Sequence, residues 1–426
     1  MRRRIFRVQK RKGWGAFLQG VRREDWMLAI INGKVYTVTN GTIEEGVILI
    51  DGGKIKAVGK DVKIPEDAEV IDAKGKTITP GLIDAHSHLA VFGEPSVWAN
   101  ADGNEMSDPV TPQIRGIDSL NPQDPAIPDV VAGGVTAVYT GPGSANIIGG
   151  TGIVMKLRGR TAEEMVIPGT EGMKMALGEN PKRVYGEGQK KAPKTRMGSA
   201  SVLREALVKA QNYIDKAEKA KEKAAKGESA SPPDRDLKME SLAKVLKGEM
   251  VARIHAHRAD DIMTAIRVLE EFNIKYVIEH CTEGYKIADV LAAKKVKATI
   301  GPLLMSRGKM EIIDTSLKNP GILAKAGVKV AIQCDTSSNT KWLALHAGIA
   351  VREGMCPEEG LKAITMNPAE ILGVADRMGS IEPGKDADLV IWSGHPFCTM
   401  TVAEKVFIDG RLVHESKDCS GNTCHH

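Results

Sequence analysis

Three absences from this 426-residue sequence limit what the protein can be. No apolar run reaches the roughly 18–20 residues that a helix needs to cross a bilayer, which excludes a membrane-spanning protein. Six cysteines in a chain of this length do not make a disulfide framework, so we expect a reducing compartment and a cytoplasmic protein. No G-x-S-x-G elbow surrounds Ser144 in GPGSAN, so a serine nucleophile is not indicated.

Basic charge is also scarce once residues 1–23 are set aside. That segment carries nine lysines and arginines and no acidic residue, and it accounts for the net charge of +5. The rest of the chain has 50 basic and 54 acidic residues, so it offers no broad basic face and we expect no nucleic-acid partner. We interpret residues 1–25 as a basic, flexible leader with no role in the chemistry. An organelle address and an arm that binds membranes or RNA are the alternatives.

The two ends of the chain have a β-rich texture that the middle does not share. Residues 26–79 and 380–415 contain short strand-like runs separated by turn sequences such as Asn32-Gly33 and Asp409-Gly410. We therefore predict one small, discontinuous β-sandwich module formed by both ends of the chain. Residues 416–426 are predicted to be a flexible tail.

The middle, residues 80–379, alternates apolar strand-like runs with amphipathic helical stretches. Serial strand–helix repeats over about 300 residues predict an α/β fold, namely a (β/α)8 TIM barrel. Residues 200–248 are rich in Ala, Lys and Glu and are predicted to be an exposed helical insertion. The loop 91–130 holds six prolines and is long enough to cover a site. The runs expected to be buried parallel strands are 134–141, 251–257, 275–281, 296–302 and 329–335.

Histidines and an aspartate stand at the ends of several of these strands. His86 and His88 in PGLIDAHSH are two residues apart, so at a strand's end both imidazoles can face one ion, about 7 Å apart. His255, His280 and Asp335 each end another predicted strand. The carboxyl ends of barrel strands meet at one mouth, where barrel enzymes carry their chemistry. Each residue alone has an ordinary structural explanation, but four strand ends that deliver such groups to one mouth predict a metal centre.

The motifs that hold these residues resemble the amidohydrolase superfamily of metal-dependent hydrolases, in its imidazolonepropionase-like or carboxypeptidase-like branch. The resemblance runs from about residue 27 to residue 415. It includes PGLIDAHSH, the HAH and IEH strands, the strand-end aspartate and the closing NPAEILGVADRMGSIEPGKDADLVIW. It implies a barrel enzyme with a small-molecule substrate and one or two Zn²⁺ ions, with other divalent metals as alternatives. Relatives in this superfamily are often oligomeric, which makes a homo-oligomer an expectation.

The resemblance also implies a role for each matching residue. His86 and His88 would bind one ion, and His255 and His280 would bind a second ion or complete the same site. Asp335 would contact the metal and the attacking water, and with His280 it is the expected catalytic residue.

Lys174 is the candidate for the bridging ligand that many members make by carbamylation of a fourth-strand lysine with carbon dioxide. An ammonium with a reference pKa near 10.4 cannot ligate a cation, whereas a carbamate presents two anionic oxygens. Glu179 is the alternative bridge, because some relatives use a carboxylate.

Residues around the expected mouth are candidates for substrate binding. His257 is an alternative fifth-strand ligand and otherwise contacts the substrate or orients a ligand. Arg258, Arg183 and Arg307 are candidates for holding a substrate carboxylate, although arginines of this kind often pair with neighbouring acids. Tyr139 precedes the small-residue loop that follows the second strand and is expected to line the mouth.

Neutral imidazoles with one carboxylate suit Zn²⁺, which lowers the pKa of water from about 15.7 to about 7. Asp335 can take the proton of that water and return it to a leaving nitrogen. The sequence thus predicts hydrolysis of a C–N bond in a dipeptide, an N-acyl amino acid or another amide, or a cyclic amide. The arginines slightly favour a substrate with a carboxylate.

Two other functions compete with this prediction. A heterocycle deaminase uses the same scaffold, but such enzymes place a glutamate three residues after the fifth-strand histidine, where this chain has Arg258. A non-catalytic scaffold that kept the barrel is the alternative from a different class of function. Such relatives have lost metal ligands, whereas every ligand position is filled here.

Overall fold

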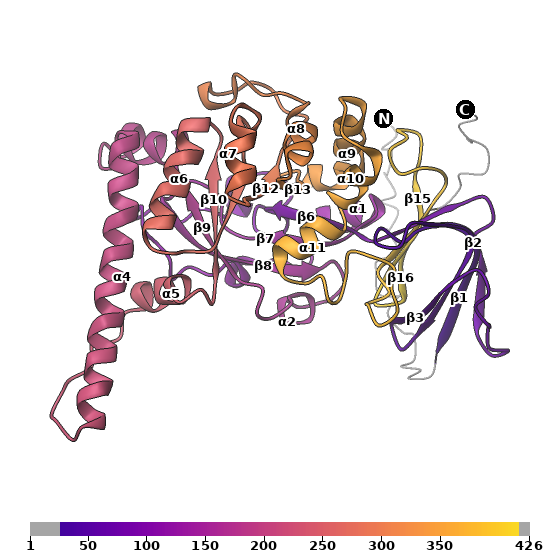
Figure 1. The fold of residues 1–426 in the computed structure, drawn as a ribbon, viewed down its shortest axis with the longest axis horizontal. Coiled ribbons are helices and arrows are strands. Elements are labelled where there is room, and N and C mark those ends of the chain that lie inside the picture. Colours follow the sequence, from indigo (N-terminus) through magenta and orange to yellow (C-terminus); the bar gives the residue numbers. More distant parts are fainter. Residues whose placement is uncertain (1–25, 417–426) are drawn as a thin grey trace, which may run out of the picture.

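Eight strands in the middle of the chain form the barrel, in a computed structural model that describes residues 26–416. Figure 1 shows this barrel at the centre of the molecule, with helices packed around it. The five strands predicted from apolar runs are all present. The last four pair in parallel with one another, and the first pairs in parallel with the strand that ends at the HxH motif. This arrangement confirms the TIM-barrel prediction. In sheet order the strands are β6 (Leu82–Ser87), β7 (Val135–Thr140), β8 (Ile148–Lys156), β9 (Gly172–Ala176), β10 (Val251–Ala256), β11 (Tyr276–His280), β12 (Lys297–Ile300) and β13 (Lys329–Ile332).

The third barrel strand runs against the others, which the sequence reading did not predict. β8 pairs antiparallel with both β7 and β9, and residues 141–147 connect β7 to β8 without a helix. A side chain at Gly152 would place its Cβ 2.6 Å from the carbonyl oxygen of Thr140, so the two strands meet too closely for any residue except glycine. The glycines that permit this contact also hide the strand pattern in the sequence.

Helices follow most barrel strands and cover the outside of the barrel. Their apolar residues join the main core with the outward-facing residues of the strands. Among the described helices, none is long and apolar enough to cross a bilayer. The helices are α1 (Ala126–Ala132), α2 (Ala162–Met165), α3 (Glu179–Lys182), α4 (Arg196–Ala225), α5 (Leu237–Leu246), α6 (Ala259–Glu271), α7 (Ala288–Ala293), α8 (Asn319–Ala326), α9 (Leu343–Arg352), α10 (Pro357–Lys362) and α11 (Met366–Leu372).

The segment predicted to be an exposed helical insertion, residues 200–248, is helical but only partly exposed. Leu203 and Leu207 of α4 and Leu242 of α5 are fully buried in the main core, so this part of the prediction is corrected. The end of α4 and the connection to α5 extend beyond the rest of the molecule in Figure 1. High Ala, Lys and Glu content describes a helix well, but it does not separate the half that packs on the barrel from the half that projects.

Both ends of the chain build a second sheet beside the barrel, at the right of Figure 1. Hydrogen bonds join all of its strands into one sheet, where the sequence predicted a sandwich. Alternate residues of its strands, such as Leu28, Ile48 and Phe407, meet in a separate hydrophobic cluster. The strands are β1 (Met27–Tyr36), β2 (Thr42–Asp51), β3 (Lys54–Gly59), β4 (Glu69–Asp72), β5 (Thr77–Pro80), β14 (Leu389–Trp392), β15 (Ala403–Ile408) and β16 (Arg411–Glu415). The leader predicted for residues 1–25 and the tail predicted after residue 416 lie outside the described residues.

A buried ion-pair network joins the sheet module to the barrel. The ammonium of Lys156, the last residue of β8, lies 2.7 Å from Asp386 and 3.0 Å from Asp388, and it also pairs with Asp409. The side chains of Lys156, Asp386 and Asp388 are each less than a tenth exposed. Burial alone would lower the pKa of Lys156, but Asp388 and Asp409 hold that pKa above its ordinary value. Lys54 and Arg377 also pair with Asp386, and Arg158 pairs with Asp409, so Asp388 is the buried carboxylate that depends on Lys156 for its ion pair.

We expect Lys156→Met to destabilise the protein by about 3–5 kcal/mol, because it leaves the buried carboxylate of Asp388 without its cation. Chemical unfolding followed by circular dichroism measures the change. Lys56→Met is the matched control, since Lys56 is half exposed in its pair with Asp51 and should contribute less than about 1 kcal/mol. Equal losses in the two variants would show that the network does not join the two parts of the fold.

Candidate metal centre

One group of metal-ligating side chains comes from the first barrel strand and the end of the last. Nε2 of His86 and Nε2 of His88 lie 3.3 and 3.5 Å from the same oxygen, Oδ1 of Asp335. His86 is on β6, His88 directly follows it, and Asp335 lies three residues after β13. Strand β6 and the end of β13 are adjacent, as the hydrogen bond from the Asp335 amide to the His86 carbonyl shows. The structure therefore brings together the three residues predicted to form a first ion site.

A second group lies beside the first and consists of three buried histidines. His255 and His257 come from β10 and its carboxyl end, and His280 ends β11. The His280 ring lies 4.4 Å from the His255 ring and 5.2 Å from the His86 ring, between centroids, so the two groups adjoin. Nε2 of His280 is also 3.8 Å from Oδ1 of Asp335. The structure thus places His257 with His255 and His280, where the sequence left its role open.

Hydrogen bonds hold three of these imidazoles by Nδ1, and an ion-pair contact holds a fourth. Nδ1 of His88 lies 2.8 Å from the carbonyl oxygen of Gly141, and Nδ1 of His280 lies 2.8 Å from that of Gly301. A carbonyl oxygen only accepts, so each Nδ1 carries the proton and each Nε2 keeps its lone pair. Nδ1 of His86 lies 2.7 Å from Glu279. Nδ1 of His257 lies 2.7 Å from the hydroxyl of Thr282.

Burial keeps four of the imidazoles uncharged, because it lowers the pKa of His88, His255, His257 and His280. It lowers the pKa of His280 to about 3 and that of His255 well below its ordinary value. Both ring nitrogens of His255 are buried and lack a hydrogen-bond partner. An orphaned buried imidazole costs free energy unless something ligates it, and neutral imidazole is the form that binds a metal. The donor set therefore fits one or two divalent cations of the kind that prefer nitrogen and carboxylate ligands.

Lys174 on β9 lies directly beside these histidines, with Nζ 3.3 Å from Nε2 of His86. Its side chain is fully enclosed, and burial lowers the pKa of Lys174 to about 8. Glu179, the alternative bridge, begins α3, and its carboxylate accepts from the backbone amide of Glu311. The geometry therefore favours Lys174 over Glu179 as the bridging ligand, because Lys174 lies next to a ligating histidine.

Strand ends near the centre depart from extended geometry. His280 has φ 67° and Asp335 has φ 68°, in the left-handed region that is uncommon for residues other than Gly, although Asn, Asp and His enter it more often than the rest. Neighbouring residues on a strand point to opposite faces, yet Glu279 and His280 both face the centre. The left-handed turn at His280 makes this possible. Such strain is typical of residues whose orientation serves a site.

Beneath the histidines lies a charged layer that the sequence reading missed. Glu279 is fully buried, and its oxygens lie 2.7 Å from His86 and 2.8 Å from Arg253. Thr299 donates a hydrogen bond to the same carboxylate. Burial alone would raise the pKa of Glu279, but Arg253 and His86 hold it well below its ordinary value. Lys174 acts in the same direction. The signal in the sequence was the pair Glu279-His280 within IEH, next to a predicted ligand.

Asp84 is a second residue that the sequence reading missed. It lies two residues before His86, on the same side of β6, and is fully buried. One of its oxygens accepts from the backbone amide of His86 and the other from that of Cys334. Burial raises the pKa of Asp84 to about 7. This carboxyl group ties the HxH strand to the segment that carries Asp335.

Of the candidates for substrate binding, His257 lies in the second histidine group, and the others belong to neither group of ligating side chains. The Tyr139 hydroxyl donates to the carbonyl of Gly172, at the start of β9, so Tyr139 fills the barrel interior below the site. Arg258 pairs with Asp260, as the alternative reading allowed. Arg183 and Arg307 are exposed. A tyrosine on a barrel strand cannot be assigned to the mouth or to the interior from the sequence alone, because both positions share the inward face.

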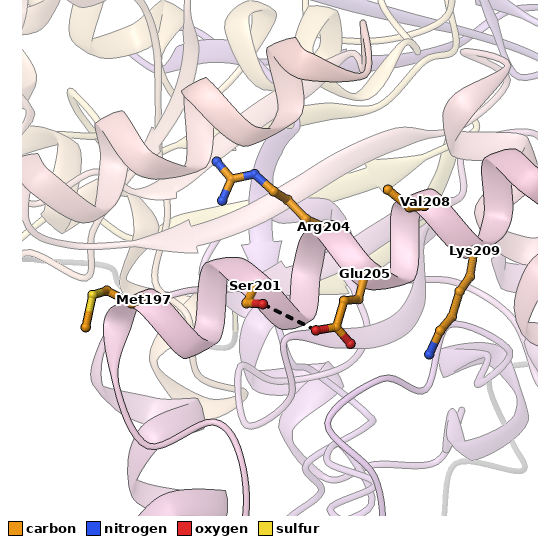
Figure 2. Close-up of a pocket in the computed structure, with 6 residues that line it drawn as sticks. All are labelled: Met197, Ser201, Arg204, Glu205, Val208 and Lys209. Atoms are coloured by element: carbon orange, nitrogen blue, oxygen red, sulfur yellow. Dashed lines mark hydrogen bonds between the residues drawn. The ribbon is translucent and has the colours of Figure 1, made fainter.

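A hollow on the outer surface is separate from this centre. Figure 2 shows that it lies along the first half of α4, with exposed Met197 and Val208 and a hydrogen bond from Ser201 to Glu205. None of the histidines or acids described above comes from α4. The hollow therefore adds nothing to the centre at the strand ends.

We expect Glu279→Gln to weaken metal binding by about 10–100-fold, because an amide holds the Nδ1 proton of His86 less well than a carboxylate does. It also leaves buried Arg253 without an anion, which should lower stability. Metal content after dialysis and the unfolding midpoint measure the two effects. Thr299→Val is the control, because it removes only the hydroxyl that donates a hydrogen bond to the Glu279 carboxylate. Unchanged metal binding in Glu279→Gln would contradict the role of Glu279.

Known proteins share both this fold and much of its sequence. An amidohydrolase of solved structure from Thermotoga maritima is 46% identical, with a TM-score of 0.86, over 91% of this chain and 100% of that chain. The imidazolonepropionase of Geobacillus kaustophilus is 27% identical over 83% of this chain and 85% of its own length. Amidohydrolase tasK of Hapsidospora irregularis is 30% identical over 86% of this chain, which spans only 39% of that protein.

The family match covers most of the chain and agrees with the position of the histidines. Residues 77–413 match the amidohydrolase family, from the strand before the HxH motif to the last strand of the sheet module. This match includes every residue of the two groups of ligating side chains. The chain belongs to the amidohydrolase family, a family of hydrolases.

Proposed function

We propose that this protein is a zinc-dependent amidohydrolase that uses water to break a C–N bond in a small molecule. The observation that carries the proposal is the convergence of five imidazoles, one carboxylate and one buried lysine at the carboxyl ends of the barrel strands. A bound Zn²⁺ ion would polarise a carbonyl group and make water acidic enough to supply hydroxide at neutral pH. His86, His88, His255, His257 and His280 are the proposed nitrogen ligands.

Asp335 is the proposed proton carrier. Burial alone would raise the pKa of Asp335, but the neighbouring imidazoles, His280 first, hold it well below its ordinary value. The group is therefore a carboxylate at neutral pH and can accept a proton from water. Its side chain is about three-tenths exposed, unlike the fully enclosed Glu279, so a substrate can reach it. After C–N cleavage it would return the proton to the leaving nitrogen.

Lys174 is proposed to carry a carbamate, formed when its neutral amine adds to carbon dioxide and releases one proton. The pKa of about 8 leaves a useful fraction of neutral amine at physiological pH, where an exposed lysine has almost none. The carbamate replaces the ammonium next to His86 with an anionic group that has two oxygens. Such a group can bridge two ions.

A cyclic amide is the substrate class that we favour. Support comes from relatives of similar length that carry the name imidazolonepropionase, several of them matching more than 80% of this chain. Arg258, one of the arginines that pointed to a dipeptide or N-acyl amino acid, already pairs with Asp260. A release assay over hydantoins, imidazolones, dipeptides and N-acyl amino acids, run with metal counting, tests the class of substrate. Ammonia release from aminated heterocycles with one ion per chain would instead indicate a deaminase.

We expect His86→Ala and His88→Ala each to lower zinc content and turnover together. The loss should exceed the roughly 10–100-fold that follows removal of a hydrogen-bonding partner of a ligand, because the ligand itself is gone. His395→Ala, in the sheet module, is the control and should keep both the zinc content and the turnover of the unmodified protein. Turnover that persists in a His86→Ala protein without zinc would contradict a zinc-dependent reaction.

We expect bicarbonate to speed the return of zinc to chelator-treated protein. At a fixed concentration of dissolved carbon dioxide, the effect should grow as pH rises through about 8, because only the neutral amine of Lys174 reacts. Lys174→Gln should bind fewer ions and should not respond to bicarbonate. Zinc uptake followed with a chromophoric chelator measures both. Equal uptake with and without bicarbonate in the unmodified protein would contradict the carbamate.

A further inference from the structure

Two charged side chains reach the second histidine group from the loop between β12 and α8. Lys309 and Glu311 lie at and beside the short helix Met310–Ile312, which the sequence reading did not connect to the centre. Lys309 Nζ lies 3.1 Å from Nε2 of His257, and it pairs with Oε1 of Glu311. Neither residue belongs to a barrel strand. Their position therefore depends on how this loop folds over the mouth.

The carboxylate of Glu311 lies where a further ligand of the second group would stand. Its Oε1 is 3.7 Å from Nε2 of His255 and 3.6 Å from Nε2 of His257. Ligands about 2.0–2.2 Å from a tetrahedral ion lie roughly 3.3–3.6 Å from each other, so the separation from His257 lies within this range and that from His255 is 0.1 Å above it. Glu311 is 1% exposed, and its other oxygen accepts from the backbone amide of Glu179 at 2.8 Å. The carboxylate is therefore held in place.

The second histidine group needs an anionic ligand that the first group does not provide. Asp335 lies closer to His86 and His88 than to His280, and no distance below 4 Å joins it to His255 or His257. His255 has two buried ring nitrogens without hydrogen-bond partners, which points to a ligand between His255 and Glu311. Glu311 is the carboxylate that approaches both of the β10 histidines.

Lys309 places a single positive charge in this same space. Its ammonium is in contact with both Nε2 of His257 and the Glu311 carboxylate, which are the atoms that a cation would contact. It lies 3.4 Å from Oδ1 of Asn180, on the outer side of the group. Neighbouring Gly308 and Met310 are exposed. The side chain can therefore leave without moving a barrel strand.

We propose that Glu311 is a ligand of the second ion, together with His255, His257 and His280, and that Lys309 is a cationic substitute that this ion displaces. The proposal rests on the proposed function, because it assumes that the centre takes a second ion. It gives the loop after β12 two tasks. The loop completes the second site, and it neutralises the buried Glu311 carboxylate while no ion is bound.

Two substitutions separate these tasks, because they should move the affinity of the second ion in opposite directions. Glu311→Gln keeps the size and the acceptor for the Glu179 amide but removes the anion, so zinc at the second site should bind at least about tenfold more weakly. Lys309→Met removes the competing cation, so zinc should bind the second site more tightly, by about tenfold. Lys286→Met is the matched control, since Lys286 forms exposed ion pairs with Glu283 and Asp314.

Zinc titration against a competing chelator, with elemental analysis of the dialysed full-length protein, measures both affinities without an activity assay. The thermal midpoint gives an independent readout. Metal-free Lys309→Met leaves the buried Glu311 carboxylate without the lysine that neutralises it, so the thermal midpoint should fall and should recover on addition of zinc. If Glu311→Gln does not fold, the Lys309→Met titration and its midpoint decide the proposal.

The outcomes distinguish this proposal from the proposed function. Unmodified protein that binds less than one ion per chain at saturating zinc would end the proposed function. Unmodified protein that binds two ions, with Glu311→Gln binding two equally well, would overturn only the role of Glu311. Unchanged zinc affinity and an unchanged metal-free midpoint in Lys309→Met would overturn the role of Lys309.

Discussion

The constraint on which the centre depends is the enclosure of five imidazoles at one end of the barrel. Burial keeps the rings of His88, His255, His257 and His280 neutral, and a neutral ring has a lone pair that can bind a cation. Carbonyl oxygens and Glu279 fix the protons on Nδ1 of three of the rings, so their Nε2 atoms point toward common space. His255 has no such partner, so the orientation of its ring depends on the group that its nitrogens bind in this shared space.

The fold supplies this enclosure through the arrangement of strands rather than through any single loop. Strands β6, β9, β10, β11 and β13 end at the same mouth, and each delivers one or two groups there. The antiparallel β8 leaves β9 paired on both sides, which holds Lys174 in register with Arg253 of β10. Lys156, the last residue of β8, belongs to the ion-pair network that joins the barrel to the sheet module. One irregular strand therefore supports the site and links it to the second sheet.

The sequence predicted the parts of this site that come from regular structure. Strand ends in a barrel share an edge, so His86, His88, His255, His280 and Asp335 could be placed together from spacing and apolar runs. Residues that arrive by irregular routes could not be placed. Glu311 comes from a loop of no recognisable pattern, and the inward turn of His280 beside Glu279 depends on a positive φ angle that no periodicity encodes. Tyr139 was misplaced because an inward-facing side chain can point along the barrel axis in either direction.

The charges at the centre explain why two lysines and several acids lie so close together. Three cationic side chains, Lys174, Arg253 and Lys309, face three anionic ones, Glu279, Asp335 and Glu311, so this set is balanced without an ion. Two divalent ions would add four positive charges to a buried space, which low dielectric strongly opposes. The proposed carbamylation of Lys174 would remove two of these charges, and departure of Lys309 would remove one more. A single excess positive charge would then remain, which would favour a substrate whose carbonyl oxygen becomes negative during hydrolysis.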